Sequence, residues 1–90
     1  AAIYQHPAVA EAAVYGVPDE RLGEVVAASV VLREGAELSA DALRDFLREH
    51  IAAFKLPEHL RFHTEALPRI ATGKIFKRQL KAELAEQLAG

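Results

Sequence analysis

The dipeptide Gly73-Lys74 is the position in this sequence best suited to chemistry. Thr72 precedes the pair, and Lys77 and Arg78 follow it in what the spacing predicts as the first turn of a helix. A long ammonium side chain on a glycine-hinged loop can reach a phosphate or carboxylate oxygen outside its own domain. Against the charge of a phosphoryl transition state, one such donor is typically worth about 3–4 kcal/mol. The residues alone leave a second interpretation open, a solvated surface lysine.

A nucleotide-cradling phosphate loop is excluded at this dipeptide. Such a loop needs a glycine five residues before the second glycine and a hydroxyl residue after the lysine. Those positions hold Pro68 and Ile75.

Sequence patterns give little support for other catalytic sites or for a metal site. His59 and His63 share one face of a strand or a helix, but no third ligand is near in sequence, so we interpret them as surface histidines and predict no metal site. There is no Gly-x-Ser-x-Gly elbow; Ser29 falls inside a predicted strand and Ser39 precedes a predicted helix. With no cysteine in the chain, thiolate zinc sites and cysteine nucleophiles are excluded.

Composition indicates one small globular domain of 90 residues, 51% of them hydrophobic and 27% charged. The richest apolar run, Val25 to Leu32, is too short to span a membrane, and the start has no signal-peptide pattern. The lack of cysteine fits a reducing compartment, so we expect a cytoplasmic protein. Because the sequence has no methionine and opens in an apparent helix, we expect it to be a piece of a longer chain.

Charge is distributed unevenly although the net charge is only −2. Residues 1–53 hold four arginines and nine acidic residues, a net of −5, whereas residues 54–90 hold seven basic and four acidic residues, a net of +3. Such asymmetry can steer an anion toward one end of a domain. The overall balance argues against a general nucleic-acid binder.

The elements that must position these residues form an α+β domain, a small, mostly three-stranded sheet with helices packed on it. The opening helix should end near Gln5 or His6, because Pro7 follows. Ala12 to Val17 and Glu24 to Arg33 are near-continuous apolar strands, which predicts a sheet covered on both faces.

A helix should follow Ser39, which is a plausible N-cap, and run to about Ala52. Leu60 to His63 alternates apolar and polar residues, as expected of a half-exposed strand near the sheet edge. Residues 66–73 form a loop, ordered or mobile. The last helix spans Ile75 to Leu88, with an apolar stripe at four-residue spacing: Phe76, Leu80, Leu84 and Leu88.

The segment Leu67-Pro68-Arg69-Ile70-Ala71-Thr72-Gly73-Lys74-Ile75-Phe76-Lys77-Arg78-Gln79-Leu80 resembles the last core motif of adenylate-forming enzymes. That superfamily includes acyl-CoA synthetases, peptide-synthetase adenylation domains and luciferases. Three more stretches agree in order: His6-Pro7-Ala8-Val9 with Ala12-Ala13-Val14, Gly16 to Glu24, and Phe54-Lys55-Leu56-Pro57. The resemblance covers essentially the whole chain.

This resemblance implies that residues 1–90 are a single C-terminal lid subdomain of a two-domain ligase whose N-terminal adenylation domain is absent from this chain. It implies ATP and CoA as substrates, with Mg²⁺ bound by the absent domain. Lys74 would contact the substrate carboxylate and the α-phosphate during adenylation, after which the lid would rotate for thioester formation. Phe54 and Lys55 would contact the CoA nucleotide.

The sequence departs from the family pattern at three positions. Leu56 and Glu58 stand where certain members have basic residues, and Ile70 replaces the usual threonine of the motif. A CoA phosphate clamp beside Phe54 is therefore not expected. Packing of Phe54 into the core is an equally good interpretation of that residue.

We therefore predict the lid of an ATP-dependent acyl-CoA synthetase for fatty acids or related carboxylates, inactive as an isolated fragment. The alternative is a stand-alone small α/β module that binds an anionic ligand or RNA, which salt-dependent binding would favour. A third hypothesis is an interaction domain whose last helix docks on a partner and in which Lys74 is replaceable.

Overall fold

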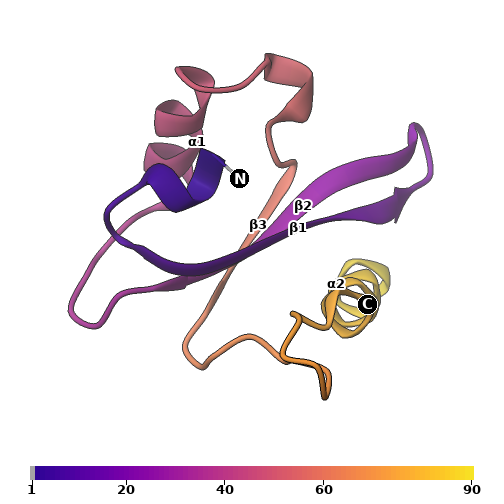
Figure 1. Cartoon of the computed structure of the whole chain (residues 1–90). Coiled ribbons are helices and arrows are strands. Elements are labelled where there is room, and N and C mark those ends of the chain that lie inside the picture. Colours follow the sequence, from indigo (N-terminus) through magenta and orange to yellow (C-terminus); the bar gives the residue numbers. More distant parts are fainter. Residues whose placement is uncertain (1) are drawn as a thin grey trace.

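The structure, a computed structural model that describes residues 2–90, is a three-stranded sheet with one α-helix on each face (Figure 1). The predicted α+β class is confirmed. In chain order, with η for a 3₁₀ helix, the elements are η1 (Ala2–Gln5), β1 (Val9–Asp19), β2 (Gly23–Leu32), α1 (Ala40–Arg48), η2 (Ala53–Lys55), β3 (His59–His63) and α2 (Lys77–Ala89).

Strands β1 and β2 form a long antiparallel hairpin, paired from Val9 opposite Leu32 to Asp19 opposite Gly23, with one register shift between Val9 and Glu11. Both strands were predicted, although β1 is longer at each end than the apolar run that indicated it. The Asp19 carboxylate closes the turn by accepting hydrogen bonds from the backbone N–H groups of Arg21 and Leu22, at 3.1 and 2.8 Å. Gly23 completes the turn with a φ of +80°, which disfavours any side chain.

Both faces of the sheet are covered, as the apolar strands predicted. On one face α2 packs over β1 and β2 and forms the α2-side core, made of Ala13, Tyr15, Val17, Val25, Ala27, Leu67, Leu80 and Leu84. On the other face α1 and η1 form the α1-side core, made of Ile3, Val9, Ala12, Ala28, Val30, Leu43 and Leu47.

Helix α1 links β2 to β3, and this crossover makes β3 parallel to β2. The predicted N-cap is confirmed, because the Ser39 hydroxyl accepts a hydrogen bond from Ala42 N at 3.0 Å. The predicted end near Ala52 was wrong. The α-helix ends at Arg48. The backbone N–H groups of Glu49 and His50 donate to the carbonyls three residues earlier, those of Phe46 and Leu47, and the chain then turns toward η2.

The remaining elements agree with their predicted places but differ in detail. The opening helix ends at Gln5, as expected, and is a single 3₁₀ turn. Strand β3 lies at the sheet edge, with β2 in the centre. Helix α2 begins at Lys77, two residues later than predicted, because Ile75 pairs with Arg69 in an isolated β-bridge. Of the apolar residues spaced four apart, Leu80 and Leu84 are buried in the α2-side core, whereas Leu88 is 48% exposed and lies outside both cores.

Candidate functional site

Lys74 lies on an ordered two-armed turn, which we call the lysine hairpin (residues 68–76). Its arms are joined by hydrogen bonds from Phe76 N to Pro68 O at 2.7 Å and from Ile70 N to Lys74 O at 2.9 Å. Gly73 N bonds to Ile70 O at 2.9 Å and closes the tip, where Gly73 has a φ of +90°. Of the two interpretations of this loop, the ordered one is therefore correct.

The Lys74 side chain is exposed and makes no salt bridge within residues 2–90. Lys77 and Arg78, at the start of α2, are exposed as well. Ile75 and Leu67 anchor the base of the hairpin against the α2-side core. The arrangement presents an unpaired ammonium group on a structured support, so the group is available to an anion from outside the domain.

Arg69 braces the lysine hairpin from inside. Its Nη1 donates to the Gly73 carbonyl at 2.7 Å, and its Nη2 donates to Oε1 of Glu11 on β1 at 3.1 Å. In the sequence, Arg69 stands out only as part of the motif, and no pattern marks Glu11. No local pattern could have paired them, because they lie 58 positions apart.

Phe54 is 80% exposed on η2, so its alternative interpretation as a core residue is wrong. Lys55 Nζ lies 5.7 Å from the centre of the Phe54 ring, within cation–π range. A groove runs between η2 and the β1–β2 hairpin, and we call it the phenylalanine groove; its lining includes Gly16, Leu22, Glu24, Phe54, Leu56 and Glu58. An aromatic face beside a cation and an exposed leucine suits a flat heterocycle.

Arg44 of α1 supports the segment that follows η2, a role that no sequence pattern indicates. Its Nε donates to Pro57 O at 3.1 Å and its Nη2 donates to Glu58 O at 3.0 Å. These two bonds hold the chain between Phe54 and β3.

The lysine hairpin and η2, which carries Phe54, lie on different sides of the sheet (Figure 1). The hairpin base packs into the α2-side core, whereas Leu56, two residues after Phe54, packs against the α1-side core. The sheet separates them. The structure therefore does not bring Lys74 together with Phe54 and Lys55 into one site.

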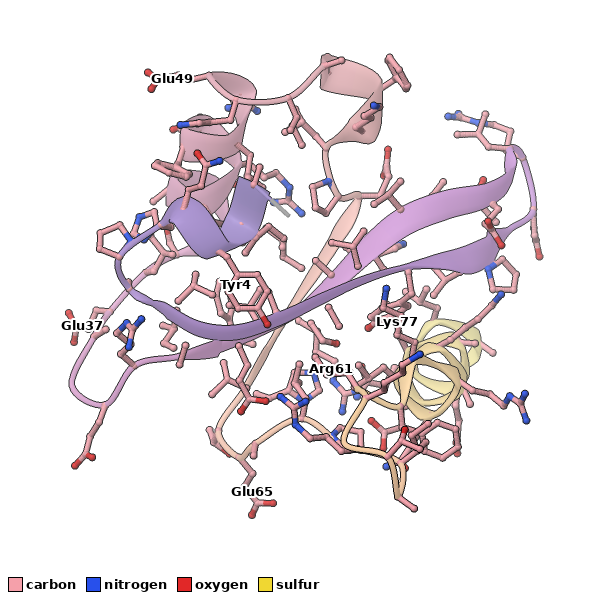
Figure 2. All side chains as sticks on the ribbon, in the orientation of Figure 1. Tyr4, Glu37, Glu49, Arg61, Glu65 and Lys77 are labelled. Atoms are coloured by element: carbon pink, nitrogen blue, oxygen red, sulfur yellow. The ribbon has the colours of Figure 1, made fainter. Side chains whose placement is uncertain are left out.

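A charged cluster joins β3 to α2. Arg61 reaches from β3 toward α2 (Figure 2), and its Nη1 lies 2.9 Å from Oε1 of Glu83. Hydrogen bonds from Gln79 and then from Arg61 lower the pKa of Glu83. Burial, and then the nearby Arg61 charge, lower the pKa of His63, whose Nε2 is buried without a hydrogen-bond partner among the described residues.

The described part of the chain offers no metal site and no activated serine. Within residues 2–90, no three His, Cys, Asp or Glu side chains are placed to hold a metal ion, and His59 and His63 stand at the two ends of β3. Ser29 is buried in β2 with its Oγ 2.7 Å from the Tyr15 hydroxyl. It holds the sheet together and is not accessible to a substrate.

Residues 1–74, most of the chain, match the protein family described as the AMP-binding enzyme C-terminal domain. The chain belongs to this family. The resemblance seen in the sequence is thereby confirmed, and the lysine hairpin and the phenylalanine groove become features of an AMP-binding C-terminal domain.

Relatives of this AMP-binding C-terminal domain include CoA ligases. It is 44% identical over 85 residues to the long-chain-fatty-acid–CoA ligase of Bacillus subtilis and 41% identical over 81 residues to the oxalate–CoA ligase of Saccharomyces cerevisiae, covering 94% and 90% of the chain. Among solved structures, ATP-bound MatB from Rhodopseudomonas palustris superposes with a TM-score of 0.87 over 94% of the chain, at 34% identity.

The matches involve only a small part of each relative. The chain spans 15% of each of the two CoA ligases and 17% of the MatB chain. None of the helices within residues 2–90 has the length and apolar character needed to cross a membrane.

Proposed function

We propose that this domain is the mobile C-terminal lid of an ATP-dependent acyl-CoA synthetase whose N-terminal adenylation domain lies outside the chain. Support comes from the family, from CoA ligases among the relatives and from a structural neighbour that binds ATP. The acyl substrate, a fatty acid or a related carboxylate, would bind to the absent domain. The chain by itself would then be inactive, because one lysine without an ATP site cannot activate a carboxylate.

Lys74 supplies the positive charge for adenylation, and the observation that carries this proposal is its exposed, unpaired side chain on an ordered hairpin. In the reaction, a carboxylate oxygen attacks the α-phosphorus of ATP, and the bond to the pyrophosphate leaving group breaks. The ammonium group would hold the two anions together and stabilise the charge that develops on phosphorus.

Mg²⁺, when bound, would neutralise phosphate charge in this reaction. The residues described here do not fit such a site, because no three of their carboxylate or imidazole side chains converge. We therefore assign the ion to the absent domain.

The second half-reaction uses the other side of the lid. In it the CoA sulfur attacks the acyl carbonyl and AMP leaves. The exposed Phe54 ring with Lys55 above it would bind the CoA nucleotide by stacking and by charge. Because the sheet separates this groove from Lys74, the proposed lid would dock in a different orientation in each step and rotate between them.

The test uses the full-length enzyme and compares Lys74→Ala with Lys77→Ala, an exposed lysine three residues later. We expect Lys74→Ala to slow pyrophosphate exchange by about 10²–10³-fold, as loss of one transition-state donor does. Thioester formation from pre-made acyl-adenylate should stay within about twofold, because Lys74 has left the site by then. Lys77→Ala should preserve both rates. If Lys74→Ala also preserves both, Lys74 is an ordinary surface lysine.

A further inference from the structure

We propose that Glu11 and Arg69 are positioning residues for Lys74: their ion pair ties the lysine hairpin to β1 in the conformation that presents the lysine. This inference rests on the role proposed above for Lys74. Neither residue touches substrate in this scheme. They act through the backbone that carries the ammonium group.

The Arg69 guanidinium makes two hydrogen bonds, one to Gly73 in the lysine hairpin and one to Glu11 on β1. Its 2.7 Å hydrogen bond to Gly73 O lies in the short range typical of charged donors. The Gly73 carbonyl belongs to the peptide group that leads into Lys74, so fixing this carbonyl fixes the direction in which the lysine side chain leaves the backbone. A lysine has a long flexible stem, and its reach is defined only as well as its Cα is placed.

Through Glu11, Arg69 connects the lysine hairpin to the sheet. Its side chain is 21% exposed, the lowest value among the carboxylates of the domain's ion pairs, and Arg69 is 46% exposed. A partly desolvated pair is screened less than an ordinary surface ion pair. The Arg69 guanidinium is thus oriented by a carboxylate that projects from β1, a long strand paired with β2 from Glu11 to Asp19.

An irregularity in β1 turns Glu11 toward the lysine hairpin. Alternation along a strand would place Val9 and Glu11 on one face, together with Ala13. Val9 instead packs into the α1-side core, whereas Ala13 packs into the α2-side core, and the β1–β2 register shifts between Val9 and Glu11. The additional residue of β1 at this shift lets the strand bury Val9 on one face and point Glu11 to the other. β-Bulges commonly redirect a side chain in this way.

The pair between Arg61 and Glu83 provides a matched control. It also pairs a guanidinium with a carboxylate, at 2.9 Å, and it links β3 to α2. The Arg61 side chain is 26% exposed and the Glu83 side chain 38% exposed. The pair makes no hydrogen bond to the lysine hairpin in the described structure. Breaking it should therefore perturb the domain without moving Lys74.

The experiment compares Glu11→Ala, Glu11→Gln, Arg69→Ala, Glu83→Ala and Lys74→Ala in the full-length enzyme. We expect Glu11→Ala and Arg69→Ala to lower kcat for pyrophosphate exchange by about tenfold to a hundredfold, the effect of misplacing a reacting group by about 1 Å. Thioester formation from pre-made acyl-adenylate should stay within about twofold. Glu11→Gln, which keeps a hydrogen-bond acceptor, should recover part of the lost rate, and Glu83→Ala should keep both rates.

Amide hydrogen exchange adds a readout that does not depend on activity. The protected amides of Ile70, Gly73 and Phe76 should exchange faster in Glu11→Ala and Arg69→Ala but not in Glu83→Ala. Equal loss of both half-reactions, or unchanged exchange at these amides, would mean a merely structural pair and would overturn the inference. If Lys74→Ala slows adenylation while the Glu11 and Arg69 variants do not, only the positioning role fails. A fully active Lys74→Ala enzyme would instead overturn the proposed function.

Discussion

At the scale of single residues, the buried polar pair of Tyr15 and Ser29 joins β1 to β2 within the sheet. Ser29 is completely buried, and its only hydrogen bond to a side chain within residues 2–90 is the 2.7 Å contact with the Tyr15 hydroxyl. We expect Tyr15→Phe to lower the free energy of unfolding by about 1–3 kcal/mol, because a buried hydroxyl loses its partner. The double variant Tyr15→Phe/Ser29→Ala should recover most of this loss. Urea unfolding measures both, and additive losses would show that the hydrogen bond is not the cause.

At the scale of elements, α2 is held to the sheet by Leu80 and Leu84. Leu80 is completely buried, whereas Leu88 on the same helix is 48% exposed. We expect Leu80→Ala to cost about 2–5 kcal/mol through lost burial and a cavity, and Leu88→Ala to be nearly neutral. Urea unfolding of the two variants tests this directly, and similar losses at both positions would mean that the helix packs along its whole length.

At the scale of the whole molecule, acid should destabilise the domain at the junction of β3 and α2. His63 has a lowered pKa, so below its usual value of 6.5 the unfolded chain binds more protons than the folded one, and stability falls with pH down to the folded pKa. Glu83, also with a lowered pKa, contributes stability above its usual value of 4.5, and this is lost as pH falls through its folded pKa.

The histidine contribution can be isolated by comparing His63→Gln with the parent protein. Thermal unfolding midpoints between pH 7 and about 5.5 should fall less steeply in His63→Gln than in the parent protein. An unchanged slope in His63→Gln would assign the acid sensitivity to other groups.

What the sequence by itself determined is local. Spacing of apolar residues located all three strands and both α-helices, Ser39 marked the start of α1, and the motif around Lys74 indicated the family. These properties depend on residues within a few positions of one another, because backbone preferences and side-chain periodicity act over one or two turns.

Only the tertiary structure decided which distant groups meet. It exposed Phe54, buried Leu80 but not Leu88, put Lys74 and Phe54 on different sides of the sheet, and paired Glu11 with Arg69. Each outcome depends on strand register, on the bulge in β1 or on where a helix crosses the sheet. A one-residue shift in register moves a side chain to the opposite face, so local pattern cannot specify such contacts.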